Sequence, residues 1–380
     1  MQLSMSGALL VLVLWCGLGA VKAVEQLQLK AAEHPIAFTG SKLCTSDILV
    51  IVIASQKRDT WKLQADTWLQ HFPHYIATEQ HTPKCKMCGS PEVTPHKGSL
   101  FEGALYFGDR FHHRPLDWYC AQQRPMQALA RVLAQAQARA SLPKWLVIID
   151  DDTALHPWNA LKMMAAAQPS TAASGLDKPI LYGSEYRGGA GFIFNRAALQ
   201  NLSNPIPVVD MSWDRQLLQW TEQQGGSMVT GMDACVHRLM GGSWCYMHSD
   251  HVMGLCAKSA NIQVLDRNGT MAQWCPVGTM LLDPKAVGGR VNNLRDATKA
   301  DTKTQSWLTD HMVSCHYMDK TAMDSIYDMI KGTWAPASPS GQQGAAPSTQ
   351  EAASSSGQAA PSGAQPAKQA RRLAGSSRGR

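Results

Sequence analysis

The stretch Lys144-Trp145-Leu146-Val147-Ile148-Ile149-Asp150-Asp151-Asp152-Thr153 decides the fold, because it joins five apolar residues to three consecutive carboxylates. An apolar run of this kind predicts a buried β-strand. Ligands of open α/β sheets bind beyond the carboxyl ends of the strands, where these acids lie. Two carboxylates 4 Å apart repel by about 4 kcal/mol at an effective dielectric constant of about 20. The triplet is therefore either a solvated turn, with Asp152 capping a helix, or a metal site.

Strand-like and helix-like segments alternate on both sides of this strand. Gln123 to Ala140 predicts a helix with Pro125 in its first turn, and Pro157 begins another helix after the acids. Upstream, Asp47 to Ala54 predicts a first buried strand, and Trp61 to His71 predicts the helix that follows it. This alternation predicts an α/β fold, with a central sheet flanked by helices.

A glycine-rich run, Gly188-Gly189-Ala190-Gly191, separates two further predicted strands, Pro179 to Gly183 and Phe192 to Phe194. The run lacks the Lys-Ser/Thr of a P-loop and the spacing of a dinucleotide-binding fingerprint. Its glycines either let the backbone approach a flat ligand such as a sugar, or form a tight turn between the strands. The later part of the chain predicts helices over Arg196 to Leu202, Asp210 to Gln224 and Gly231 to Met240, and a short strand over Val313 to His316.

Composition and the two ends of the chain predict one folded domain in the secretory pathway. The 380 residues have a net charge of +6 without a long Lys/Arg run in the body, so we expect no nucleic-acid partner. The apolar run Gly7 to Val21 is too short for a comfortable membrane span, and residues 1–23 are expected to be a signal peptide or a short signal anchor. We expect a stem over 24–43, the folded domain over 44–334 and a disordered Ala/Ser/Pro/Gly-rich tail over 335–380.

The cysteines agree with a lumenal or secreted protein. Nine of them lie outside the apolar run, which predicts several disulfides and at least one free or intermolecular thiol.

Four motifs in this order resemble the fringe-like β-1,3-glycosyltransferase family, most closely its plant and algal members. They are Asp150 to Asp152, the glycine run Gly188 to Gly191, Gly231-Met232-Asp233-Ala234-Cys235-Val236, and Val313-Ser314-Cys315-His316-Tyr317. The resemblance covers about residues 47–318. It implies a GT-A fold with a mixed central sheet, a UDP-sugar donor, Mn²⁺ or another divalent cation, and a glycan or glycoprotein acceptor.

The resemblance also implies which residues bind the metal and the donor. Asp152 and His316 would ligate the metal, and Asp150 and Asp151 would hold the donor or support the metal site. The glycine run, Gly188, Gly189, Ala190 and Gly191, would lie against the donor. Taken alone, His316 is equally compatible with a buried histidine that satisfies its own hydrogen bonds.

Asp233 would be the general base that deprotonates the acceptor hydroxyl. Animal fringe proteins have two adjacent acids at this position, whereas Met232 precedes Asp233 here. Asp233 is also well suited to cap the helix that follows it. The implied reaction is an inverting, metal-dependent transfer of a hexose or N-acetylhexosamine from a UDP-sugar, forming a β-1,3 linkage.

Two other functions remain open. A sugar- or UDP-binding protein on the same scaffold would bind its ligand without transfer, and Met232 in place of a second acid favours it. A metal-dependent phosphatase of the haloacid-dehalogenase type also has two acids after an apolar strand. Its motif places Thr or Val two residues after the second acid, where this chain has Ala154.

Overall fold

The computed structural model describes residues 26–38, 43–82, 116–167, 178–183, 188–207, 215–223, 228–241, 244, 247–267, 270–272, 297–299 and 302–334. All of these residues belong to the first of two compact units of the chain, Met1–Ser338. The expected signal segment, 1–23, and the expected disordered tail, 335–380, lie outside the described residues. No described helix combines the length and the apolar character that crossing a bilayer requires.

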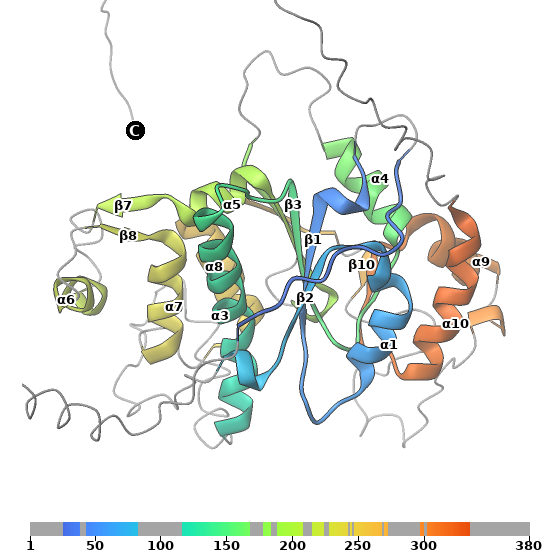
Figure 1. The fold of residues 1–380 in the computed structure, drawn as a ribbon, viewed down its shortest axis with the longest axis horizontal. Helices are drawn as coiled ribbons and strands as arrows, with labels where there is room; N and C mark the ends of the chain where they lie inside the picture. The colour runs from blue at the N-terminus through green and yellow to red at the C-terminus, as the bar shows by residue number, and fades with distance from the viewer. Residues whose placement is uncertain are drawn as a thin grey trace, which may run out of the picture. The chain divides into compact units, whose positions relative to one another are not determined.

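A mixed six-stranded sheet with the strand order β2-β1-β3-β6-β5-β9 forms the centre of the fold (Figure 1). Its strands are β1 (Ile48–Ile53), β2 (His74–Ala77), β3 (Trp145–Asp150), β5 (Ile180–Tyr182), β6 (Phe192–Asn195) and β9 (Gln263–Leu265). The strand β1 runs parallel to both β2 and β3, whereas β6 runs antiparallel to both β3 and β5. The predicted α/β class with a mixed sheet flanked by helices is confirmed.

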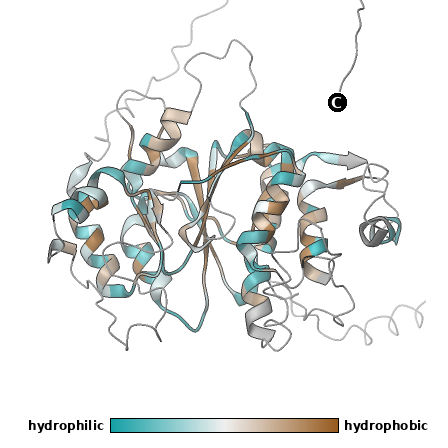
Figure 2. Cartoon of the chain, turned by 180° about the vertical axis from the view of Figure 1, so that it is seen from behind, coloured by the Kyte–Doolittle hydropathy of each residue, from teal (hydrophilic) through white to brown (hydrophobic). Residues whose placement is uncertain are grey.

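Helices cover both faces of this sheet (Figure 1). One face packs against α3 (Leu116–Ala138), α5 (Arg196–Ser203), α7 (Gly231–Gly241) and α8 (Ser249–Ser259), and the other against α1 (Thr60–Asp66), α4 (Pro157–Ala167) and α10 (Lys320–Ile330). Alternate residues of β1 enter the two cores, with Val50 on one face and Ile51 on the other. This double coverage explains the uninterrupted apolar runs of β1 and β3, and Figure 2 shows the hydrophobic residues concentrated on these strands.

Two smaller sheets complete the fold. The three-stranded sheet has the order β10-β11-β4, and β7 pairs with β8 in a two-stranded sheet. The remaining elements are β4 (Ala154–Leu155), β7 (Pro205–Pro207), β8 (Met228–Thr230), β10 (Met271–Ala272), β11 (Ser314–Cys315), α6 (Arg215–Gln223) and α9 (Thr302–Ser306). A disulfide joins Cys235 of α7 to Cys256 of α8. Cys120 and Cys315 are also disulfide-bonded, whereas Cys44 is a free thiol.

Several predicted elements have different boundaries in the structure. Helix α3 begins at Leu116, so Pro125 lies inside the helix and not in its first turn. The helix predicted over Trp61 to His71 is interrupted at Thr67, where the backbone leaves helical values before a 3-10 turn. The capping role considered for Asp152 is wrong, because β4 separates the acids from α4.

Candidate metal centre and adjoining pocket

Asp150, Asp152 and His316 come together at the carboxyl end of β3. Nε2 of His316 lies 2.9 Å from Oδ1 of Asp152 and 3.5 Å from Oδ2 of Asp150. One potential ligand atom from each of the three residues lies within 4.8 Å of the others. Two carboxylates and an imidazole suit a divalent cation such as Mn²⁺. These three residues, called the metal group below, therefore have the composition and the spacing of a candidate metal centre.

The hydrogen bonding of this group also fits a cation. Oδ1 of Asp152 is buried, yet it has no hydrogen-bond partner among the described residues. Nε2 of His316, at 2.9 Å, is its ion-pair partner when the imidazole is protonated. A buried carboxylate oxygen without a partner is costly, and a bound cation would remove that cost.

The three-stranded sheet explains how residues far apart in the sequence meet here. Asp152 lies shortly before β4, and His316 directly follows β11. The two strands are antiparallel, with Ala154 opposite Cys315, so the chain before β4 runs beside the chain after β11. A hydrogen bond from the Met318 amide to the Asp152 carbonyl, 2.8 Å long, continues this pairing beyond the strands.

The glycine run packs against the imidazole of His316. Residues Gly188–Ala190 form a 3-10 turn between β5 and β6, and a Cβ atom on Gly189 would overlap the His316 ring. The turn is fixed by two hydroxyl groups: Thr153 donates to the Gly189 carbonyl (2.7 Å) and Ser314 donates to the Ala190 carbonyl (2.5 Å). The run therefore forms a tight turn that holds a candidate ligand, and its predicted contact with a donor stays a prediction.

Asp151 has a different environment from its two neighbours. Strand β3 ends at Asp150, and Asp151 lies in the turn that follows, where the Thr153 amide donates to the Asp150 carbonyl (3.2 Å). Asp151 is buried, and its Oδ1 lies 2.9 Å from Nη1 of Arg58. The same Arg58 nitrogen lies 3.5 Å from Oδ2 of Asp152, and the Ser55 amide donates to Oδ2 of Asp151 (3.4 Å). Asp151 thus fixes the loop after β1 beside the metal group.

The electrostatics of the acids differ. Burial raises the pKa of Asp150 to about 7; attraction to His316 opposes this rise, and the Asp152 and Asp151 carboxylates add to it. Because 42% of the Asp150 side chain is exposed, solvent screens part of this effect. Burial would also raise the pKa of Asp152, but the close His316 and the Arg58 charge outweigh it and lower that pKa. A bound cation would favour the ionised form of both acids.

A pocket of about 670 Å³ adjoins the acids at the carboxyl ends of β1 and β3. Its size lies within the usual range for a small-molecule or cofactor site. Asp150 and Asp151 form part of its wall, together with the basic residues Arg58 and Arg124. The Arg124 guanidinium also donates to the Ala54 carbonyl (2.8 Å), which fixes it at the end of β1. The pocket thus places two guanidinium groups beside the metal group.

These pocket residues were not predicted from the sequence. Arg58 follows the first predicted strand closely, and position after a core strand is the signal that could have identified it. Arg124 lies on α3 and pairs with Glu79 (3.2 Å), a residue that follows β2. Since β2 itself was not predicted, the sequence offered no way to bring Glu79 and Arg124 together.

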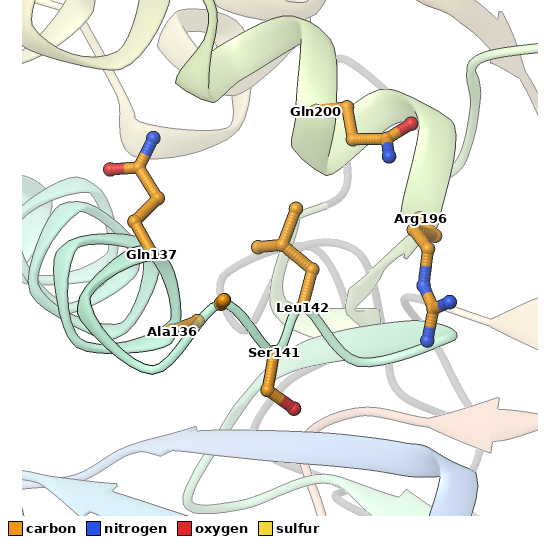
Figure 3. A pocket seen from close by; sticks show the side chains of 7 residues that line it. Ala136, Gln137, Ser141, Leu142, Arg196 and Gln200 are labelled. Carbon is orange, nitrogen blue, oxygen red and sulfur yellow. The ribbon is translucent and has the colours of Figure 1, made fainter.

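A second pocket, of about 600 Å³, lies between the end of α3, the turn after it and α5 (Figure 3). Its polar side chains are Gln137, Ser141, Arg196 and Gln200, and its lining contains no acid. It lies near the amino end of β3, because the Arg196 amide donates to the Lys144 carbonyl. The carboxyl end of β3 is therefore the better candidate for a metal-dependent site.

The structure does not bring Asp233 to the metal group. Asp233 is exposed in the first turn of α7, where its Oδ2 accepts a hydrogen bond from the Thr230 hydroxyl (2.6 Å) and its amide donates back to that hydroxyl (3.0 Å). The preceding Gly231 lies against the carbonyl of Leu202, near the end of α5. Helix α5 starts beside the amino end of β3, and its Asn201 donates to the Ala260 carbonyl.

This arrangement puts Asp233 near the end of the sheet where β3 starts, whereas Asp150 lies at the end where β3 finishes. Ala260 follows α8 and comes just before β9, whose first residue, Gln263, pairs with Ile180 at the start of β5. The starts of β5 and β9 lie at the same end of the sheet as the start of β3, because β5 and β3 are both antiparallel to β6. These hydrogen bonds make Thr230 the residue that caps α7, with Asp233 as its partner in the first turn of the helix.

Comparison of the sequence with models of known protein families, and with curated proteins, finds no match.

Proposed function

We propose that the chain is an inverting, metal-dependent glycosyltransferase of the fringe-like type with a GT-A fold, acting in the lumen of the secretory pathway. It would transfer a hexose or N-acetylhexosamine from a UDP-sugar to a glycan or glycoprotein acceptor, forming a β-1,3 linkage. The single observation that carries this proposal is the Asp150, Asp152 and His316 group beside the arginine-lined pocket. Three basic side chains line the pocket beside three acids: Lys57, Arg58 and Arg124, and Glu79, Asp150 and Asp151. A cation held by the metal group would add the positive charge that suits a diphosphate ligand.

The residues of the site would divide the binding of the donor between them. Asp150, Asp152 and His316 would hold Mn²⁺, which neutralises the charge that develops on a departing diphosphate when it is bound. Arg58 lies on the pocket side of the acids, and its planar guanidinium can bind phosphate oxygens. Arg124 supplies a second positive charge deeper in the wall of the pocket. These side chains would place the anomeric carbon of the donor next to the acids.

The transfer itself forms one bond and breaks another. The oxygen of an acceptor hydroxyl bonds to the anomeric carbon while the bond from that carbon to the UDP oxygen breaks. The hydroxyl proton passes to a general base, and the electron pair of the broken bond leaves with UDP. The resemblance assigns the base to Asp233, which lies in the first turn of α7, away from the metal group.

The separation between Asp233 and the metal group supports a second candidate function. A UDP- or sugar-binding protein on this scaffold needs the metal group and the pocket but no base near the acceptor. Met232 in place of a second acid, and the capping hydrogen bonds of Asp233, both favour binding without transfer. The phosphatase alternative has no such support, because Ala154 is buried in β4 and pairs with Cys315.

One experiment separates the candidates. Purified protein is incubated with a panel of UDP-sugars and mixed glycan acceptors, and UDP release is measured with Mn²⁺ and after EDTA treatment. The proposal predicts Mn²⁺-dependent release that the variant Asp152→Ala abolishes and that Asp328→Ala leaves unchanged, since Asp328 is an exposed aspartate on α10. Mn²⁺-dependent UDP binding without release from any donor would favour the binding protein. Absence of UDP binding would refute both.

A further inference from the structure

Arg58 contacts the acids with one nitrogen atom and leaves the rest of its guanidinium facing solvent and the pocket. Its Nη1 lies 2.9 Å from Oδ1 of Asp151 and 3.5 Å from Oδ2 of Asp152. Within the described part of the chain, Nε and Nη2 of Arg58 have no hydrogen-bond or ion-pair partner. The side chain is 52% exposed, and Arg58 forms part of the pocket wall. Two nitrogens of a fixed cation are therefore left for a ligand in the pocket.

The backbone around Arg58 is held in place without the help of the guanidinium. The Arg58 amide donates to the Ser55 carbonyl (3.1 Å), which closes the turn after β1. The Ser55 hydroxyl donates to Oε1 of Glu79 (2.6 Å), and the Gln56 amide donates to Oε2 of the same carboxylate (2.9 Å). A change in the Arg58 side chain alone would leave these anchors in place.

The charge of Arg58 lies where it competes with a divalent cation. Asp152 has its Oδ1 beside His316 and its Oδ2 beside Arg58, so a cation on Asp152 would share this carboxylate with a guanidinium. Two positive charges about 4 Å apart repel enough in bulk water to weaken binding about fivefold. The bulk-water value applies because half of the Arg58 side chain is exposed. Arg58 therefore disfavours a cation that binds by itself.

A diphosphate in the pocket would remove this competition. Arginine binds phosphate oxygens with two parallel N–H groups, and Nε and Nη2 of Arg58 form such a pair. Nη1 can meanwhile stay on Asp151, so the guanidinium would bridge the acids and the diphosphate. Once the diphosphate balances its charge, Arg58 no longer repels a cation on Asp152.

We infer that Arg58 couples the two ligands of the site: it disfavours a divalent cation alone and accepts one that arrives with a diphosphate. This inference rests on the proposed function and adds to it the residue that regulates cation binding. The coupling has to be reciprocal, so the cation would raise the affinity for the diphosphate by the same factor. The direct attraction between cation and diphosphate does not need Arg58 and would remain without it.

A purely positioning role for Arg58 predicts the opposite sign. If the guanidinium served only to hold Asp151 and Asp152 in place, its removal would loosen the candidate ligands and weaken cation binding. Competition by charge predicts instead that its removal strengthens the binding of a cation alone. The direction of the change in Mn²⁺ affinity therefore separates the two roles.

The test is titration calorimetry of the full chain with Mn²⁺, in the absence and in the presence of saturating UDP. The wild type is compared with Arg58→Gln, which keeps a hydrogen-bond donor for Asp151 but has no charge, and with Arg58→Lys, which keeps the charge but not the planar fork. Lys62→Gln is the matched control, because it removes the same charge from an exposed side chain of α1 that pairs with Asp59. The experiments are run at pH 8, above the pKa of Asp150, which is about 7.

Without UDP, Arg58→Gln should bind Mn²⁺ about fivefold more tightly than the wild type, and Arg58→Lys and Lys62→Gln should match the wild type within about twofold. The gain in Mn²⁺ affinity that UDP causes should be about fivefold smaller in Arg58→Gln than in the wild type.

Unchanged or weaker Mn²⁺ binding by Arg58→Gln without UDP overturns the inference, and so does an equal gain from UDP in the two proteins. Tighter Mn²⁺ binding by Arg58→Lys overturns it as well, because that variant keeps the charge. These outcomes leave the proposed function standing. Absence of UDP binding, or UDP and Mn²⁺ binding without UDP release, counts against the proposed transfer and not against Arg58 alone.

Discussion

Replacing Gly189 with alanine tests whether the glycine run supports the metal centre through His316. The added Cβ would overlap the ring atoms Cε1, Nδ1 and Nε2 of His316. The surroundings leave little room for the turn to retreat, because Thr153 holds the Gly189 carbonyl and Ser314 holds the next one. The imidazole is therefore the group that has to move, and it carries the nitrogen that faces Asp152.

The size of the effect follows from two contributions. Inserting a methyl group into a packed region costs about 1–3 kcal/mol of folding stability. Displacing a metal ligand by disturbing what orients it typically lowers metal affinity by about 10- to 100-fold. We expect the Gly189→Ala variant to show both effects, with the loss of Mn²⁺ affinity as the diagnostic one.

Gly332→Ala is the matched control, because a Cβ at Gly332 has no neighbouring atom within 4 Å. Mn²⁺ affinity is measured by titration calorimetry, and stability by urea unfolding, for both variants and for His316→Ala. The double variant Gly189→Ala/His316→Ala should bind Mn²⁺ no more weakly than His316→Ala alone, since the two changes act through one residue. Wild-type Mn²⁺ affinity in a folded Gly189→Ala protein would refute this account of the glycine run.

Four further predictions concern other parts of the site and the fold. Asp233→Asn separates the two roles of Asp233: a base would lose UDP release while keeping UDP binding. A residue that only supports the start of α7 would preserve release, and the lost charge would cost about 0.3–1 kcal/mol in urea unfolding. The pKa of Asp150 is raised to about 7, so this group stabilises the metal-free protein at low pH, and that stability is lost as the pH rises through 7. Mn²⁺ affinity should increase over the same interval, because the ionised carboxylate is the metal ligand. Thermal unfolding and calorimetry between pH 5 and 8 check both trends, and Asp150→Asn should flatten them. Replacing Cys235 and Cys256 with serine removes the link between α7 and α8 and should cost about 3 kcal/mol in urea unfolding. Finally, the melting temperature should rise with Mn²⁺ concentration. The free energy of unfolding should increase by about 2.7 kcal/mol at a Mn²⁺ concentration of 100 times Kd, as mass action requires.

The sequence predicted the parts of the fold whose burial is uniform along an element. The apolar runs of β1 and β3 were recognisable because helices cover both faces of the sheet. The buried face of α3 followed from its helical spacing, although Pro125 misplaced the start of the helix. A proline marks a helix start often but not always, and here the helix begins at Leu116, nine residues before it.

Other elements carried weaker signals or none. Helix α10 has buried residues at helical spacing, Ala322, Met323, Ile326 and Ile330, after an Asp319 side chain that accepts a hydrogen bond from the Ala322 amide. That pattern was readable as a capped amphipathic helix and was missed. The short strand predicted over Val313 to His316 corresponds to β11, whereas β4 has only two residues, too few for any periodicity to reveal it.

The candidate site was likewise predicted only in part from the sequence. Asp150 to Asp152 and His316 were identified from the sequence, but their grouping came from resemblance, because the pairing of β4 with β11 is a tertiary contact. The separate environment of Asp151 was not readable from strand alternation, because β3 ends at Asp150 and Asp151 lies in the turn that follows. Its partner Arg58 was not readable, because that contact depends on the path of the loop after β1.

The metal group is held in place by features that do not need a metal. Asp150 ends a strand that is hydrogen-bonded on both sides, to β1 and β6. His316 lies between Cys315, which is disulfide-bonded, and Tyr317, whose ring covers it, while Gly189 supports its other face. The three candidate ligand side chains are therefore each fixed by contacts with the rest of the protein, so a cation would have little further chain to order. Such preorganisation would suit the proposed function, in which a cation binds together with a nucleotide, because little binding free energy would be spent on ordering the ligands.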